Sequence, residues 1–173
     1  PGQPYRAYRA CVIVQCSLTK YVYVKEVLLG DQKRPASTAT RDALIEFRRL
    51  ARVEAQDPQL QIQRVLSDFG SEFKGACAAW LANEGIEHIQ TVASKSAANG
   101  TCERAVQSWR RYALGDYKAQ VRAWDAANTP TAQRTFSFVP RIPEITRRYN
   151  TKWHRLTKGQ PLLAMRANTA PTP

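Results

Sequence analysis

A carboxylate placed directly after an apolar strand is the feature that most restricts the fold of this chain. The stretch Val65-Leu66 has strand character and is followed by S-D-F-G-S-E-F-K-G at 67–75, which brings in Asp68, a glycine turn at Gly70 and an apolar Phe73. A second stretch, N-G-T-C-E-R-A at 99–105, places Glu103 in the first turn of a long helix, with 34 residues between it and Asp68. One carboxylate at a strand end and one in the first turn of a helix are a common arrangement for holding a divalent metal ion.

The composition indicates a single basic globular domain. The 173 residues include 26 Lys and Arg against 14 Asp and Glu, which gives a net charge of +12, and the mean hydropathy is −0.47. Such a charge excess favours a polyanion partner, most simply nucleic acid; a basic surface that serves solubility or docks an acidic protein is the alternative. No apolar run approaches the roughly 20 residues of a membrane helix, so we expect no membrane partner. The cysteines described below, expected to be reduced, favour an intracellular protein. We expect a domain over residues 1–166 and a linker-like tail over 167–173.

The four cysteines do not form a zinc pattern. Cys11, Cys16, Cys77 and Cys102 contain no C-x-x-C pair, and both histidines lie far from them in sequence. Each cysteine has apolar or strand-like neighbours, so we expect buried, reduced thiols; a structural disulfide is the less favoured alternative.

Strands and helices alternate along the chain. Apolar, β-branched runs predict a hairpin from 10–15 and 21–27, followed by a loop over 28–39 and a helix that opens at Thr40. Further segments read as a strand at 61–66, a helix at 74–83, a strand at 87–92, a long helix at 101–126 that is broken or bent near Gly115-Asp116, and two short helices at 143–149 and from Pro161. This order predicts an α/β fold with a mixed sheet flanked by helices.

Asp68 and Glu103 are the candidate catalytic and metal-binding residues. Two-metal phosphoryl transfer uses carboxylates around ions about 4 Å apart, one ion activating the attacking oxygen and the other stabilising the leaving oxygen. Hard carboxylate oxygens suit Mg²⁺ or Mn²⁺. Taken singly, Asp68 is an ordinary turn residue and Glu103 complements the helix dipole; their combination favours a site.

Polar and basic residues around Glu103 are the candidate nucleic-acid contacts. Gln107 and Arg110 or Arg111 share a helix face with Glu103, because steps of three and four residues point the same way. Lys95 and Asn99 precede the helix and complete the predicted nucleic-acid-binding set. Phosphate contacts from such residues dominate affinity for nucleic acid.

These motifs resemble the catalytic core of retroviral and LTR-retrotransposon integrases. The quoted stretches match a D-x-G-x-x-F turn and an N-G-x-x-E-R helix start, and V-I-V-Q-C-S-L-T-K-Y-V-Y-V at 12–24 and Y-N-T-K-W-H-R-L-T-K-G-Q-P-L at 149–162 match flanking segments. The C-x-L-T-K form is closest to BEL/Pao-like elements, with gypsy-like elements the other candidate. The resemblance implies an RNase H-like fold, magnesium-dependent DNA strand transfer, nucleic acid as partner and a homodimer or larger assembly.

One family feature is missing from the sequence. The family site has three carboxylates, the first on a strand that would precede residue 10, and no Asp or Glu precedes Glu26. With two of three ligands we expect weak metal binding and no strand transfer, so the enzyme assignment stays open. Three explanations compete: a piece of an active integrase; a domesticated core that keeps nucleic-acid binding, DNA or RNA; or a structural subunit of a ribonucleoprotein whose partner supplies the strand. Location would be nuclear for an integrase and organellar for such an assembly.

Overall fold

The computed structural model describes residues 8–30, 35–91, 100–134 and 136–167. Its elements follow the predicted order of two strands, a helix, then strand, helix, strand and three helices. The elements are β1 (Tyr8–Gln15), β2 (Val22–Gly30), α1 (Ser37–Ala55), β3 (Arg64–Ser67), η1 (Ser71–Phe73), α2 (Gly75–Asn83), β4 (Glu87–Gln90), α3 (Gly100–Ala126), η2 (Thr131–Gln133), η3 (Val139–Arg141), α4 (Ile142–Thr151) and α5 (Pro161–Ala167).

Two strand pairs make up the sheet structure of the described residues. β1 and β2 pair antiparallel, with Ile13 opposite Val24 and Gln15 opposite Val22. β3 and β4 pair parallel, with Val65 opposite His88. The predicted mixed arrangement is therefore present as an antiparallel half and a parallel half, and within the described chain these halves are separate two-stranded sheets.

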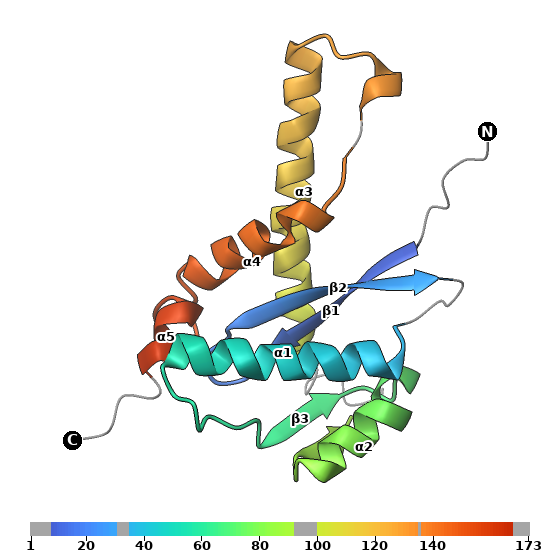
Figure 1. Ribbon diagram of the computed structural model, residues 1–173. Coiled ribbons are helices and arrows are strands. Elements are labelled where there is room, and N and C mark those ends of the chain that lie inside the picture. Colours follow the sequence, from blue (N-terminus) through green and yellow to red (C-terminus); the bar gives the residue numbers. More distant parts are fainter. Residues whose placement is uncertain (1–7, 31–34, 92–99, 135, 168–173) are drawn as a thin grey trace.

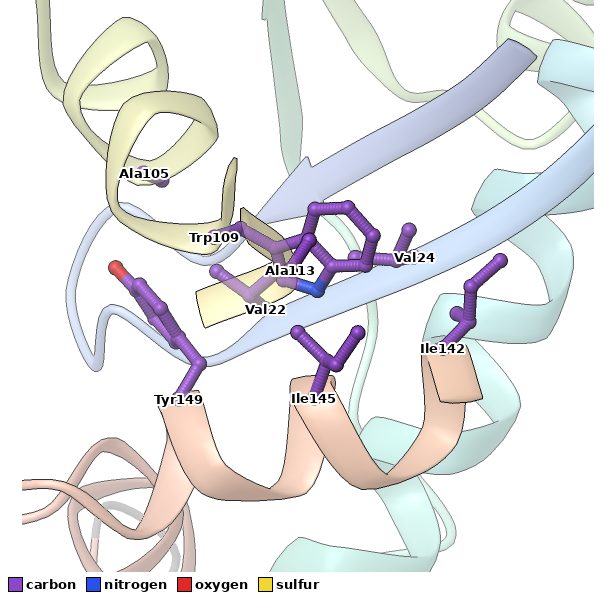
Figure 2. Packing of buried hydrophobic residues seen from close by; sticks show 8 residues of the cluster. All are labelled: Val22, Val24, Ala105, Trp109, Ala113, Ile142, Ile145 and Tyr149. Carbon is purple, nitrogen blue, oxygen red and sulfur yellow. The ribbon is translucent and has the colours of Figure 1, made fainter. Parts of the chain in front are cut away.

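Alternation along β2 places helices on both faces of the hairpin. Val22 and Val24 pack with Trp109 of α3 and Ile145 of α4 on one face, as Figure 2 shows. Tyr23 of β2, together with Tyr21 just before it, packs on the other face against α1 and α5, in the cluster Tyr21, Phe47, Ala51, Ala55 and Met165. A strand repeats its orientation every second residue, so one alternating sequence builds both layers.

The second sheet packs against α1 and α2. Val65 of β3 lies in a cluster with Leu44, Cys77, Leu81 and Ile86, and Val14 of β1 also contacts this cluster. The core therefore continues from the hairpin to the β3–β4 pair through α1, which Figure 1 shows running across both.

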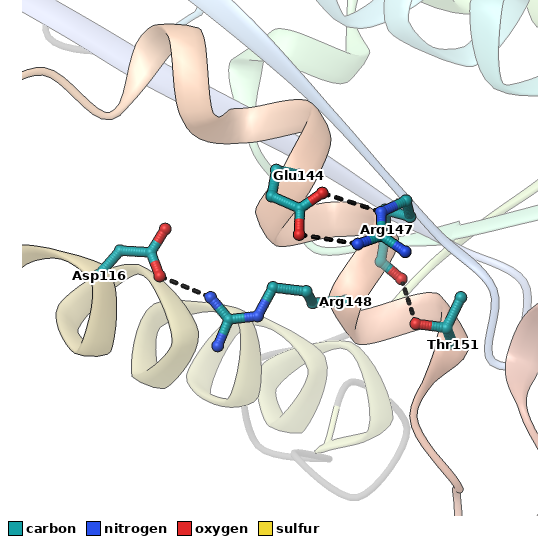
Figure 3. A network of polar contacts seen from close by, with 5 residues as sticks. All are labelled: Asp116, Glu144, Arg147, Arg148 and Thr151. Carbon is teal, nitrogen blue, oxygen red and sulfur yellow. Dashed lines mark hydrogen bonds and ion pairs between the residues drawn. The ribbon is translucent and has the colours of Figure 1, made fainter. Parts of the chain in front are cut away.

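Polar contacts fix α4 on the middle of α3. The Asp116 carboxylate of α3 pairs with Arg148 of α4 at 2.5 Å, and Glu144 and Arg147 pair within α4 (Figure 3). Asp116 also pairs with Arg141 of η3 at 3.4 Å. α3 continues through Gly115 and Asp116, so the predicted break at this point is wrong. A single helical glycine costs only about 1 kcal/mol, and the ion pairs of Asp116 help to hold the helix at this point.

Several boundaries also differ from the prediction. β2 continues to Gly30 and α1 begins at Ser37, so residues 28–30 and 37–39 of the predicted loop belong to regular elements, whereas its residues 31–34 lie outside the described part of the chain. Residues of that loop have too few local signals to mark where the strand ends. No helix in the described residues has both the length and the apolar character required to cross a membrane.

Candidate functional site

A hydrogen-bonded turn holds Asp68 at the end of β3. The Asp68 Oδ1 atom accepts the amide of Gly70 at 3.2 Å, and the Ser67 hydroxyl donates to the Asp68 carbonyl at 2.8 Å. The Ser67 carbonyl accepts both the amide and the hydroxyl of Thr91, at 2.8 and 3.1 Å. These bonds leave the second carboxylate oxygen of an exposed Asp68 unused within the described residues.

The side chain of Glu72 lies close to the glycine of this turn. Gly70 has φ −59°, a value that any residue adopts, so the turn does not need glycine's conformational freedom. A Cβ atom at Gly70 would lie 2.4 Å from the Glu72 carboxyl carbon, so the side chain of Glu72 occupies that space. Its Oε2 atom is buried without a hydrogen-bond partner among the described residues. Sequence reasoning had not singled out Glu72.

His88 supports the turn from the neighbouring strand. Its Nε2 atom lies 2.9 Å from the Ser67 hydroxyl, and its ring contacts Phe73 at 5.7 Å between centroids. Desolvation lowers the pKa of His88 below the usual histidine value, which favours the neutral ring at physiological pH.

The Cys102 thiol is affected by the charges of both candidate carboxylates. Glu103 lies in the first turn of α3 and is exposed. Desolvation by neighbouring protein atoms raises the pKa of the Cys102 thiol, although the residue as a whole is exposed to solvent, and the charges of Glu103 and then Asp68 raise it further. The Cys102 thiol therefore lies close enough to both carboxylates for each charge to raise its pKa. Cys102 was not predicted as a site residue.

The thiol offers a direct test of this proximity. We expect Asp68→Asn and Glu103→Gln each to lower the pKa of Cys102, because each removes a charge that opposes thiolate formation. The measurement is the pH dependence of alkylation by iodoacetamide, resolved to the Cys102 peptide by mass spectrometry. Glu144→Gln, on α4, is the control and leaves the profile unchanged. An unaltered profile in both site variants would show that the carboxylates are not neighbours.

The cysteine prediction holds only in part. All four cysteines are free thiols, but Cys11 and Cys102 are exposed, Cys16 is half-buried and Cys77 alone is buried. Cys102 lies in the first turn of α3 between Thr101 and Glu103, two polar neighbours that are consistent with its exposure.

The outer face of α3 carries a row of cations. Gln107, Arg110 and Arg111 are exposed on the face that begins with Glu103, as predicted. The inner face holds Ala105, Trp109 and Ala113. Further exposed cations extend the row, which comprises Arg104, Arg110, Arg111, Lys118 and Arg122. From Arg104 to Arg122 it spans about 27 Å. The other two predicted contacts, Lys95 and Asn99, lie outside the described residues.

These cations differ from most other arginines of the molecule. Nine arginines form ion pairs within the described chain: Arg41, Arg48, Arg49, Arg64, Arg134, Arg141, Arg147, Arg148 and Arg166. None of the five cations on the outer face of α3 forms an ion pair with any described residue. Their positive charge is therefore available to an anionic partner.

Known protein families give no match by sequence. No family model matches the chain, and no curated protein matches it either. Solved structures do match over almost the whole chain. The catalytic core domain of HTLV-2 integrase in complex with magnesium, in its trimeric form, has a TM-score of 0.54 at 11% identity, over 91% of this chain and 93% of that one. The fold is that of a retroviral integrase catalytic core.

Two more integrase structures agree with this assignment. The dimeric form of the HTLV-2 core in complex with magnesium has a TM-score of 0.55 at 15% identity, over 95% of this chain and 88% of that one. The simian T-cell lymphotropic virus intasome in complex with PP2A regulatory subunit B56 gamma has a TM-score of 0.57 at 9% identity, over 91% of this chain and 52% of that one. The predicted RNase H-like integrase-core fold is thus confirmed.

Proposed function

We propose that this chain is an integrase-type core that binds nucleic acid along the outer face of α3. The observation that carries the proposal is the row of exposed cations from Arg104 to Arg122, which have no ion-pair partner among the described residues. The row starts at the helix turn that holds Glu103. Nucleic acid bound there would lie with its backbone beside the two carboxylates. DNA is the expected ligand for a core of this type.

Asp68 and Glu103 are the residues that would hold Mg²⁺ or Mn²⁺. Two exposed carboxylates are a fitting donor set for Mg²⁺, which keeps several waters and takes one or two protein carboxylates. When bound, the ion would stabilise negative charge on a phosphate at this point. No group of three or more Asp, Glu, His or Cys in the described chain is arranged as a metal site. We therefore expect weak metal binding and no strand transfer by this chain, with activity in a complete parent protein of retroviral or LTR-retrotransposon type.

The salt dependence of binding tests the nucleic-acid part of the proposal. With four or five phosphate contacts, the logarithm of the association constant for duplex DNA should fall with the logarithm of salt concentration with a slope of about −4. Fluorescence anisotropy between 50 and 300 mM salt measures it. A slope near zero would exclude phosphate contacts as the source of binding. The same titration with RNA decides which nucleic acid is preferred.

A non-catalytic role is the second candidate. The absence of a three-residue acidic or thiol cluster among the described residues favours it. In that case the chain is a domesticated core that acts as a nucleic-acid-binding or structural subunit of a ribonucleoprotein. This candidate would be supported over the enzyme if the chain binds nucleic acid with the salt dependence given above but shows no strand transfer even when a complete three-carboxylate site is restored.

A further inference from the structure

The loop over 152–160, which joins α4 to α5, carries the most exposed aromatic side chain among the described residues. Trp153 is 61% exposed, whereas the other three tryptophans of the chain are buried or half-buried. Most of the Trp153 indole therefore contributes nothing to the core. Leaving so large an apolar ring in water forgoes the free energy that its burial would supply. A ring in this position favours a contact with a partner molecule.

Hydrogen bonds hold this loop in one shape. The His154 amide donates to the Gly159 carbonyl at 2.7 Å, and the Thr157 hydroxyl donates to the same oxygen at 3.0 Å. The Leu156 amide donates to Nδ1 of His154 at 3.3 Å. Desolvation and then the charge of Lys20 lower the pKa of His154, which favours the neutral ring, whose Nδ1 atom can accept that bond. A loop that is fixed before binding loses little conformational freedom when it meets a ligand.

Cations lie on both sides of the indole. Lys152 precedes Trp153, Arg155 and Lys158 follow it, and all three cations are exposed. Lys20, in the turn between β1 and β2, lies close enough for its charge to act on the histidine of the loop. None of these four cations forms an ion pair with a described residue. Their charge is therefore available to an anionic partner.

The segment that contains the loop has no acidic residue. Glu144 is the last Asp or Glu of the chain, and it pairs with Arg147 within α4. Lys152 lies over the ring of Tyr112 on α3, with 5.5 Å between Nζ and the ring centroid. Tyr112 is not part of the cation row on the outer face of α3. The loop is therefore a separate basic surface beside that helix.

An exposed indole among cations that lack ion pairs matches the chemistry of single-stranded nucleic acid. Its bases offer a free face on which an aromatic ring stacks, and its backbone offers phosphates to the neighbouring cations. In a duplex each base is enclosed in the stack, so the indole would find no face to contact. An acidic peptide would use the cations but not the ring. Binding to a membrane surface favours an amphipathic helix with a broad apolar face, which a short loop does not provide.

We propose that the loop over 152–160 binds a short single-stranded segment of nucleic acid, with one base stacked on Trp153 and adjacent phosphates contacted by Lys152, Arg155 and Lys158. Recognition is tolerant of sequence, because every base has a ring face. DNA and RNA share this chemistry, so the experiment includes both. The site goes beyond the duplex surface proposed on α3 and does not depend on it, since the two share no residue.

Oligomers of about twelve nucleotides, one of thymidine and one of uridine, test the site with the full chain. In anisotropy titrations, Trp153→Ala should weaken binding of the oligomers by about tenfold, whereas Trp153→Phe should keep most of the affinity because its ring still stacks. Leu156→Ala is the matched control, because Leu156 is 66% exposed in the same loop and has no ring. This control should bind as wild type does. The oligomer that binds more tightly identifies DNA or RNA as the ligand.

Duplex DNA separates this site from the α3 surface. Trp153→Ala should bind duplex DNA as wild type does, which also shows that the variant is folded. Alanine at Arg110, Arg111 and Lys118 together should have the reverse effect and weaken duplex binding more than binding of the oligomers. If that α3 variant binds duplex DNA like wild type, the proposed function fails while the loop site stands.

Three outcomes would overturn the loop site. One is binding of both oligomers that Trp153→Ala leaves unchanged. Another is an equal loss in Trp153→Ala and Leu156→Ala, which indicates apolar contact without stacking. The third is binding of a glutamate oligomer or of phosphatidylserine vesicles that is as tight as that of the nucleotides and equally dependent on Trp153. That result would assign the loop to an acidic protein or to a membrane surface.

Discussion

Replacing Arg110, Arg111 and Lys118 together by alanine should weaken DNA binding by roughly 100-fold at low ionic strength. The slope of the logarithm of the association constant against the logarithm of salt concentration should become less negative by about three. The three side chains are exposed on the outer face of α3 and form no ion pair with described residues. Their removal therefore deletes phosphate contacts and leaves internal contacts intact. Anisotropy titrations at several salt concentrations give both quantities.

A charge-matched variant separates this surface from the general effect of net charge. Arg41, Arg49 and Arg147 form ion pairs with exposed or half-exposed acids, at 2.7 to 2.8 Å. Alanine at all three removes the same number of positive charges from other helices, and exposed pairs contribute only about 0–1 kcal/mol each to stability. We expect the DNA binding of this control variant to depend on salt concentration as steeply as that of wild type. Equal loss in the two triple variants would show that α3 is not the binding surface.

Replacing Asn150 by alanine should lower the free energy of unfolding by about 2–4 kcal/mol. The Asn150 side chain accepts the Val22 amide and donates to the Val22 carbonyl, at 2.8 Å each, and Val22 is 0% exposed. Alanine leaves both backbone groups buried and unpaired, and each costs about 1–3 kcal/mol. Urea denaturation followed by circular dichroism measures the change.

The neighbouring residue provides a control for this variant. Thr151 is the last residue of the same helix, and within the described chain its hydroxyl bonds only to the Arg147 carbonyl one turn earlier, at 2.9 Å. Thr151→Ala should change the stability by less than about 0.5 kcal/mol. If Asn150→Ala behaves like Thr151→Ala, the amide pair with β2 does not contribute to the stability of the fold.

Local patterns were sufficient to predict most elements and the positions of both carboxylates. The alternation at 21–27 was enough to predict a strand, because alternate residues of this segment pack against the helices on opposite faces of the hairpin. Asp68 after β3 and Glu103 in the first turn of α3 occupy the predicted positions. Both predictions rest on residues close in sequence, where turn and helix signals are strong.

Contacts between distant residues could not be predicted in this way. The pairing of Asn150 with Val22 spans 128 residues. An asparagine near a helix end can instead form several local hydrogen bonds to the backbone, so its sequence position does not indicate this partner. The space that Glu72 fills beside Gly70, and the charge of Asp68 at the Cys102 thiol, depend on how the second sheet meets α3. The separation of the sheet into two halves also depends on which segments lie side by side, which local propensity does not encode.

The effect of divalent metal on DNA affinity tests most directly that Asp68 and Glu103 form a metal site at the head of a nucleic-acid-binding helix. Without metal, two carboxylates beside the phosphates oppose binding, so Asp68→Asn and Glu103→Gln should bind DNA more tightly than wild type in EDTA. With Mn²⁺ at constant ionic strength, wild type should gain several-fold in affinity, both variants should gain little, and Glu144→Gln should respond as wild type does. A gain in both site variants equal to that of wild type would contradict the proposed site.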